Sequence, residues 1–241
     1  MRVATWNVFH GRSVPPTHAD LLADFAAAIA ARPWDVLALQ EVPPWWSGPL
    51  GEATGAQVVA TRTSRLRSVA TPLQRLVGKA DPERLGSAGA GSNLLLVRPE
   101  AGTVDRHVVH TLRWLPQRRV VHAVRLVRPA GRGIWIANLH AQNRPEAAAA
   151  ADVIAALRTA ARWAGDERLV LLGDFNLPDP QQLGGDAGYT WLHGERVDHV
   201  LGRGLRAGGE ATAEVVAGPG GVQLADHRFV GVDVADAAVT V

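Results

Sequence analysis

Five short motifs in this chain place an acid, an amide or a histidine at the end of an apolar run. They are Thr5-Trp6-Asn7, Leu39-Gln40-Glu41, Asn138-Leu139-His140, Gly173-Asp174-Phe175-Asn176 and Ala225-Asp226-His227. If these segments converge, they form one pocket of oxygen ligands, amide donors and histidine. Such a pocket contains the groups that a Mg²⁺-assisted phosphoester hydrolase needs.

The best formed of these motifs follows the four consecutive aliphatic residues 169–172. Such a run predicts a strand that is buried on both faces. Gly173 then gives the backbone freedom where the strand stops. Asp174 and Asn176 are two residues apart, so their side chains can point to the same side of an extended chain. An ionised aspartate at the end of a buried strand indicates a site that uses its charge.

The hydrophobic pattern predicts many strands and few helices, which must position these motifs. Strands are expected near 2–8, 35–40, 58–61, 92–98, 103–112, 119–128, 133–139, 168–173, 197–202, 213–217 and 227–234. Helices are expected at about 18–32 and 144–164, and an irregular segment at 62–91 with a short helix near 72–78. Two packed sheets with outer helices fit this pattern better than one doubly wound sheet. No linker divides the chain, so 1–241 is expected to be one domain.

Composition narrows the class of protein. Hydrophobic residues make up 47% of the chain, which is enough for a sizeable core, and no apolar run approaches the length of a membrane span. The absence of cysteine excludes disulfides, thiolate metal sites and a cysteine nucleophile. Residues 1–7 enter a strand directly rather than a signal peptide. We therefore expect a soluble cytoplasmic protein, with a monomer as the default.

The charges are unevenly distributed although the net charge is only +2. Residues 1–145 carry 18 basic and 9 acidic side chains, whereas 146–241 carry 7 and 14. Eight arginines and no acid lie between Arg106 and Pro145. One interpretation is a cationic strip for a polyanionic substrate, with Arg118 and Arg119 beside a loop that contacts phosphates. The other is that these arginines pair with the acidic second half of the chain.

The ordered set of motifs resembles the endonuclease/exonuclease/phosphatase superfamily, which has the DNase I-like fold. The set consists of TWN, LQE, NLH, GDFN, D-H-V at Asp198 and the final DH, and it spans residue 3 to about residue 232. The resemblance implies a four-layer α/β/β/α sandwich of two packed, mostly antiparallel sheets with outer helices. It also implies a divalent metal, usually Mg²⁺ with Mn²⁺ as a possible substitute, and hydrolysis of a phosphoester.

The resemblance implies a metal-binding role for three of the motif residues. Glu41 matches the principal metal ligand, and a carboxylate suits a hard cation. Asn7 would orient the metal shell or a phosphate oxygen, although an asparagine there could also simply satisfy a turn. Asp226 would join the metal shell or tune the site. Ala225 stands where the family usually has serine before this Asp-His pair.

The other motif residues match groups that act on water and phosphate. Asp174 would position or deprotonate the attacking water, and Asn176 would donate a hydrogen bond to the phosphate. His227 would act as a general acid/base oriented by Asp198. His140 matches a histidine that contacts phosphate in several branches of the family. Of the remaining histidines, His10 is the likeliest exception to a structural role, because it follows Asn7 closely.

The choice of branch stays open. The only tyrosine is Tyr189, and the Asn-Leu-His motif is present; both features count against the abasic-site endonucleases. Trp45 and Trp46 could stack on bases, enter a lipid interface or pack against the end of a sheet. The leading hypothesis is a metal-dependent phosphodiesterase that acts on nucleic acid. The alternatives are a phospholipid, sphingomyelin or inositol-phosphate hydrolase, and a catalytically inactive binding module on the same fold.

Overall fold

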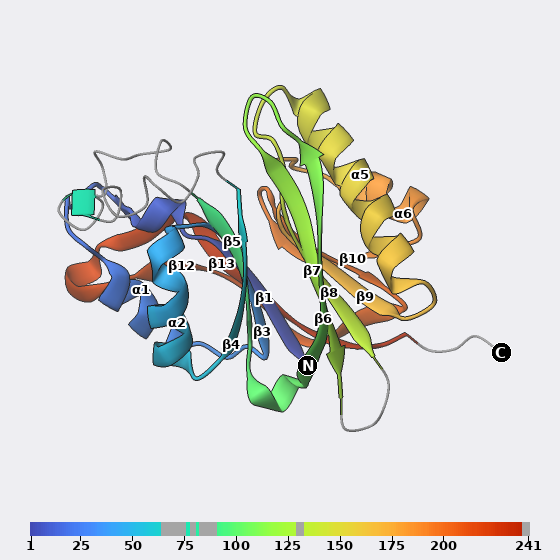
Figure 1. Ribbon diagram of the computed structural model, residues 1–241, viewed down its shortest axis with the longest axis horizontal. Coiled ribbons are helices and arrows are strands. Elements are labelled where there is room, and N and C mark those ends of the chain that lie inside the picture. The colour runs from blue at the N-terminus through green and yellow to red at the C-terminus, as the bar shows by residue number, and fades with distance from the viewer. Residues whose placement is uncertain (64–75, 78–80, 82–90, 129–132, 238–241) are drawn as a thin grey trace.

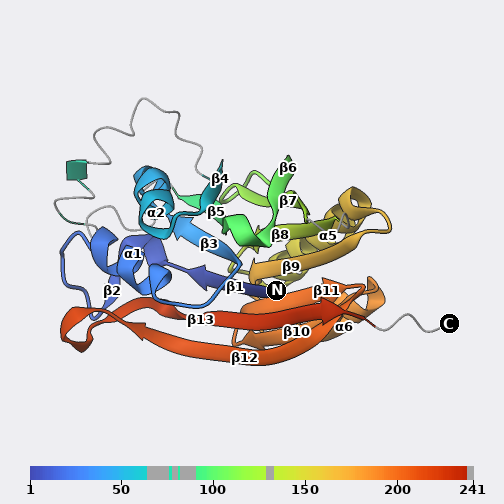
Figure 2. The same cartoon turned by 90° about the horizontal axis from the view of Figure 1, so that it is seen from below.

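Two β-sheets pack face to face in the computed structural model, and helices cover both outer surfaces (Figures 1 and 2). The structure describes residues 1–63, 76–77, 81, 91–128 and 133–237. Within that part of the chain, no helix is both long enough and apolar enough to cross a membrane. The four-layer sandwich expected from the sequence is confirmed.

The first sheet is built from both ends of the chain. Its strand order is β12 (Leu205–Ala217), β13 (Gln223–Asp236), β1 (Arg2–Asn7), β3 (Val36–Val42), β5 (Ser92–Val97) and β4 (Gln57–Arg62), and the short β2 (Ser13–Val14) also pairs with β13. Only β1 and β3 run parallel; the other neighbours are antiparallel. The outer face carries α1 (Leu22–Ala30) and α2 (Ser47–Thr54).

The second sheet is built from the middle of the chain. Its strand order is β6 (Thr103–Arg113), β7 (Arg119–Val127), β8 (Ile134–His140), β9 (Arg168–Asp174), β11 (Asp198–Arg203) and β10 (Thr190–Glu195). Here β8 and β9 are the parallel pair. The helices α5 (Glu146–Ala164) and α6 (Gln181–Asp186) belong to this half. Its arrangement reproduces that of the first sheet, with a central parallel pair and antiparallel strands on both sides.

Short 3-10 helices occupy several connections. They are η1 (Phe9–Gly11), η2 (Pro44–Trp46), η5 (Pro99–Ala101) and η6 (Pro219–Gly221). The first two lie directly after β1 and β3, where the chain turns away from the sheet.

Apolar side chains fill the three spaces between the four layers. Alternate residues of β1 show the pattern: Val3 packs between the sheets, whereas Trp6 packs against Phe25 of α1. On the other side, Trp135 and Leu157 belong to the cluster between the second sheet and α5. Because both faces of the central strands are buried, the sheets are rigid supports for whatever lies at their ends.

The boundaries of several elements differ from those predicted. The helix expected at 18–32 is shorter, because the side chain of Asp20 accepts a hydrogen bond from the backbone of Leu22 and α1 begins there. The strands expected at 213–217 and 227–234 are the ends of the longer β12 and β13. The elements α2, α6, β10 and β2 were not predicted. Most of the helix expected near 72–78 lies outside the described residues.

Candidate functional site

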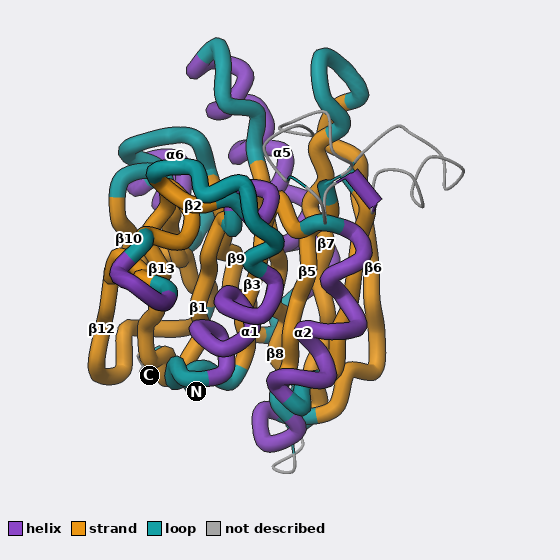
Figure 3. Tube along the Cα trace, turned by 90° about the vertical axis from the view of Figure 1, so that its left-hand side faces the viewer, coloured by secondary structure: helices purple, strands orange, loops and turns teal. Residues whose placement is uncertain are grey.

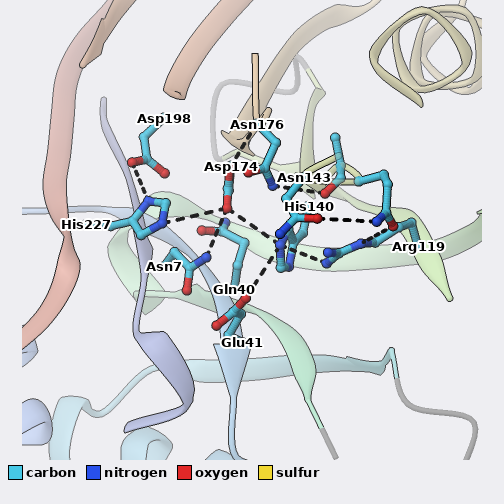
Figure 4. Close-up of polar contacts among 12 residues, drawn as sticks. Asn7, Gln40, Glu41, Arg119, His140, Asn143, Asp174, Asn176, Asp198 and His227 are labelled. Carbon is cyan, nitrogen blue, oxygen red and sulfur yellow. Dashed lines mark hydrogen bonds and ion pairs between the residues drawn. The ribbon is translucent and has the colours of Figure 1, made fainter. Parts of the chain in front are cut away.

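The five motifs meet at one edge of the paired sheets (Figures 3 and 4). Both parallel strand pairs end there, and the pairing registers align Asn7 with Gln40 and His140 with Asp174. The first residue of β11, Asp198, lies opposite Asp174 in the antiparallel register. Residues that are far apart in the sequence therefore come together because the strand ends coincide, as the sequence predicted.

Glu41 is the more open of the two central carboxylates. Its side chain is 21% exposed, and its backbone adopts a positive φ of 56° within β3, where the pairing with β5 shifts register between Leu39 and Val42. One carboxylate oxygen lies 3.2 Å from Nε2 of His10, and the other lies 3.7 Å from Nε2 of His140. Burial raises the pKa of Glu41, whereas the charges of Arg119 and His227 oppose that rise.

Asp174 is almost completely buried, and donors surround it. Oδ2 accepts a hydrogen bond of 3.0 Å from Nδ2 of Asn7, and Oδ1 accepts one of 2.9 Å from the backbone N–H of Asn176. Burial raises the pKa of Asp174, while the charge of His227 and these hydrogen bonds oppose the rise. The preceding Gly173 has φ 141°, and a Cβ there would lie 2.0 Å from the carbonyl oxygen of Leu139. Only glycine allows β9 to approach β8 so closely.

His227 and Asp198 form a hydrogen-bonded pair. Nδ1 of His227 lies 2.7 Å from Oδ2 of Asp198, and Nε2 lies 4.0 Å from a carboxylate oxygen of both Asp174 and Asp226. Burial alone would lower the pKa of His227, but the hydrogen bond to Asp198 and the surrounding carboxylates raise it to about 9. His227 is therefore protonated at neutral pH, with Nε2 directed toward Asp174 (Figure 4).

His140 is held in the opposite protonation state. Its Nε2 lies 2.7 Å from Nη1 of Arg119. A guanidinium group can only donate, so this nitrogen is the acceptor and the imidazole is neutral. Burial and the charge of Arg119 lower the pKa of His140 well below its usual range. The contact of 3.5 Å between His140 Nε2 and Asp174 is then not a hydrogen bond.

Arg119 is not a surface residue, contrary to the prediction of a loop that reaches along a long substrate. It is buried as the first residue of β7 and also donates to the side-chain oxygens of Gln117, at 2.6 Å, and Gln142, at 3.5 Å. Its cationic head therefore faces the site through His140 (Figure 4). Arg118, next to it, donates to the backbone oxygen of Arg62 and to Oγ1 of Thr111 instead.

Two arginines of the cationic strip pair with acids. Arg113 binds the carboxylate of Asp152 with N–O distances of 2.7 and 2.9 Å. Arg125 contacts Glu167 and also Asp105 at 2.6 Å. The contacts with Asp152 and Glu167 match the interpretation in which the arginines pair with the acidic second half, whereas Asp105 belongs to the first half and Arg119 faces the site.

The remaining predicted residues differ in their surroundings. Asn176 donates from Nδ2 to the carbonyl oxygen of Ala141 at 3.0 Å, which leaves its second N–H available. Asp226 is 45% exposed at the rim. Trp46 is buried against Phe25, and Trp45 is partly buried and packs against the same core, so both follow the interpretation of packing against the sheet end.

An amide network below the site ties the two sheets together, and no role was predicted for its members. Gln40 donates to Oδ1 of Asn138 at 2.9 Å and to Oγ1 of Thr5 at 3.0 Å. Asn138 in turn donates to the backbone oxygens of Leu39 and Leu94. The sequence signal that could have found them is an amide residue inside two of the motifs. Gln40 lies one residue before Glu41, and Asn138 lies two residues before His140. This network fixes the distance between the two halves of the site.

The donor set fits a hard divalent cation. Burial is the main cause that raises the pKa of Glu41 and of Asp198, and repulsion between carboxylates adds to it: the charge of Asp226 raises both values, and that of Asp174 also raises the pKa of Asp198. In addition, Oδ1 of Asp198 is buried without a partner among the described residues. Asp174, Asp198 and His227 offer ligand atoms within 4.8 Å of one another. Asp198 and His227 already share a hydrogen bond, and the more open Glu41 is a further candidate ligand.

Comparison with known proteins agrees with this fold and site. Residues 4–226 match the model of the Endonuclease/Exonuclease/phosphatase family, whose members hydrolyse phosphoesters and generally use a divalent metal. The chain belongs to this family, as the motifs predicted. A search of curated proteins gave no match.

Solved structures of low sequence identity share the fold. A functionally unknown conserved protein from Enterococcus faecalis has 14% identity and a TM-score of 0.73, with 98% of this chain and 100% of that chain covered. TDP2 from D. rerio, complexed with a single strand DNA product, has 14% identity and a TM-score of 0.70 over 98% of both chains. A mannosyl-6-phosphatase from Bacteroides thetaiotaomicron has 13% identity and a TM-score of 0.66, covering 98% and 99%.

Proposed function

We propose that this protein is a Mg²⁺-dependent phosphodiesterase that acts on nucleic acid, with residues 1–241 as one catalytic domain. The observation that carries the proposal is the convergence of Glu41, Asp174 and the Asp198–His227 pair on one sheet edge. A binding module would have no use for a base, an acid and a ligand carboxylate together.

Glu41, Asn7 and Asp226 would hold the metal ion. Glu41 is the most suitable ligand, because its carboxylate is partly open and a cation would offset the cost of its burial. When bound, the ion would supply charge stabilisation for the phosphoryl oxygens. Mn²⁺, which prefers similar ligands, is expected to substitute.

Asp174 is placed to accept a proton from the attacking water. The backbone of Asn176 and the side chain of Asn7 fix its two oxygens, so its orientation does not depend on substrate. Its raised pKa makes it a stronger base than an exposed aspartate. The free N–H of Asn176 would donate to a phosphate oxygen as negative charge develops.

His227 would donate the proton that the leaving oxygen needs. Asp198 holds Nδ1 and therefore presents the protonated Nε2 to the centre. On the opposite side, Arg119 supplies a fixed positive charge that His140 positions. In this arrangement His140 acts through the guanidinium, since its Nε2 lone pair already accepts from Arg119.

Nucleic acid is the preferred substrate because the complex of D. rerio TDP2, a protein of the same fold, contains single strand DNA. The deciding experiment is a panel of single- and double-stranded DNA, RNA, sphingomyelin, inositol phosphates and sugar phosphates, assayed with Mg²⁺, with Mn²⁺ and with chelator. We expect metal-dependent cleavage of a polynucleotide. Turnover of a headgroup or sugar phosphate alone would contradict the proposed substrate, and no turnover of any substrate would contradict the proposed enzyme.

A further inference from the structure

The loop between β6 and β7 exposes two adjacent large apolar side chains. Trp114 is 61% exposed and Leu115 is 68% exposed, whereas most other large apolar residues of the described chain are buried. An exposed tryptophan next to an exposed leucine leaves an apolar surface in water, which marks an interaction site when it has a defined position.

The loop lies on the catalytic edge. Arg113 and Arg119 are paired in register at the base of the hairpin, and Arg119 contacts His140 of the site at 2.7 Å. The hairpin rises at the top of Figure 1, beyond the same ends of the sheets where the site residues gather. A ligand that binds through a phosphate beside Arg119 can therefore also contact Trp114.

The tryptophan ring is held in place by its neighbours. Cζ of Arg118 lies 5.1 Å from the ring centroid, and this guanidinium is fixed by hydrogen bonds of 2.6 Å to Arg62 O and 3.2 Å to Thr111 Oγ1. At the base of the hairpin, Arg113 is anchored to Asp152 of α5. The ring is thus a pre-positioned aromatic surface with a cation on one side.

We propose that Trp114 is a stacking platform for a nucleobase next to the scissile phosphate. This inference rests on the proposed function and specifies its substrate as a nucleotide or a single-stranded polynucleotide. A flat aromatic surface backed by a cation suits a base, since every base has a π-face and stacking tolerates any sequence. Arg118 would also lie close to the phosphate backbone.

A membrane is the less suitable partner for this surface. Interfacial binding strengthens with the apolar area that enters the lipid, and in this loop the large exposed apolar side chains are Trp114 and Leu115. The hydrogen-bonded guanidinium of Arg118 beside the ring would have to approach the lipid as well. A base needs only the open part of the ring.

The test compares Trp114→Ala and Trp114→Phe with the wild-type protein on a single-stranded DNA oligonucleotide and on a matched strand of abasic deoxyribose phosphates. Loss of one stacked base is expected to raise KM for the oligonucleotide about 5- to 150-fold, the equivalent of 1–3 kcal/mol, with little change in kcat. Trp114→Phe should retain most of the affinity. On the abasic strand the three proteins should be alike.

The matched control is Trp191→Ala. Trp191 is 36% exposed on β10, at the opposite end of the second sheet from β6. Its replacement by alanine should therefore leave KM unchanged. Anisotropy with a labelled oligonucleotide in chelator measures the same affinity without turnover, so the platform is tested even if the enzyme assay fails. Equal affinity of Trp114→Ala and wild type would overturn the platform. So would loss of binding to anionic phosphatidylserine vesicles with unchanged binding to DNA, which would identify a membrane contact instead.

Discussion

Two strand–helix–strand units, each with parallel strands, meet at the site. They share one topology, although different roles are proposed for their carboxylates. The first unit, β1–α1–β3, ends in Asn7 and Glu41, and the second, β8–α5–β9, ends in His140 and Asp174. In each unit the second strand delivers a carboxylate, and the first strand delivers a polar partner. The topology is the same, so the difference between the two carboxylates must come from their surroundings.

The surroundings of the two carboxylates suit the different roles proposed for them, which are metal ligand for Glu41 and base for Asp174. Glu41 is 21% exposed and receives contacts at 3.2 Å and beyond, so a cation can approach it. Asp174 is only 2% exposed, and both of its oxygens already accept hydrogen bonds. The proposed division, with Glu41 as the metal ligand and Asp174 as the base, rests on this difference in burial.

The strongest test of this division is Glu41→Ala. Several kcal/mol of charge stabilisation should be lost with the metal, which corresponds to a fall in turnover of about 10⁴-fold or more. The metal-free protein should be no less stable, because the pKa of Glu41 is raised and folding therefore disfavours its charge. Calorimetric Mg²⁺ titration and thermal unfolding in chelator measure the two effects. An unchanged Mg²⁺ dependence would remove Glu41 from the metal site.

Asp174→Asn should remove the proposed base and leave the proposed metal ligand Glu41 in place. The side chain keeps its size but cannot accept a proton, so kcat should fall by up to about 10⁴-fold. The Mg²⁺ concentration needed for half-maximal residual activity should change much less than in Glu41→Gln, which is the matched amide variant. If the two amide variants shift the Mg²⁺ dependence equally, the two carboxylates are not divided in this way.

The hydrogen-bonded pair of Asp198 on β11 and His227 on β13, which joins the two sheets, should act as a unit. We expect His227→Ala and Asp198→Asn each to lower kcat by about 10²- to 10⁴-fold. Because Asp198 works through His227, the double variant should be little worse than His227→Ala alone. Measured rates that multiply would show that Asp198 does not orient the histidine.

The smallest expected effect is the difference between the pKa values of His140 and His227. In metal-free protein, NMR titration should find His140 neutral well below pH 6.5 and His227 protonated up to about pH 9. The raised pKa of His227 means that its contribution to stability is fully present below pH 6.5 and is lost as the pH rises through 9. The difference in Tm between wild type and His227→Gln should therefore shrink between pH 6.5 and 9.5. A constant difference would show that His227 is not held protonated.

The sequence predicted the strand ends well because their pattern is local. Four aliphatic residues before Gly173 define β9 and place Asp174 without any knowledge of its neighbours. Arg119 was placed at the rim because its contact with His140 depends on the pairing of β7 with β8, which no local pattern contains. The ordered motifs supplied the family, but the burial of each carboxylate needed the structure.

The missed helices have a similar cause. Ser47–Thr54 contains Gly48, Pro49 and Gly51, and Gln181–Asp186 contains two glycines, so the intrinsic helix propensity of both segments is low. Buried Leu50 in the first segment shows that packing against the core favours the helix there. Tertiary contacts of this kind are not visible in a window of sequence.

The pairing of β1 with β13 sets the order in which the protein can become active during translation. Trp6 donates to the backbone oxygen of His227 across a separation of 221 residues. While the ribosome is still making the chain, β1 lacks its antiparallel neighbour, and His227 has not yet been synthesised. A nascent chain that stops before β13 therefore has neither a complete first sheet nor His227, the residue proposed to donate the proton. If the proposed nuclease activity is correct, such an unfinished chain is expected to leave its own messenger RNA uncleaved.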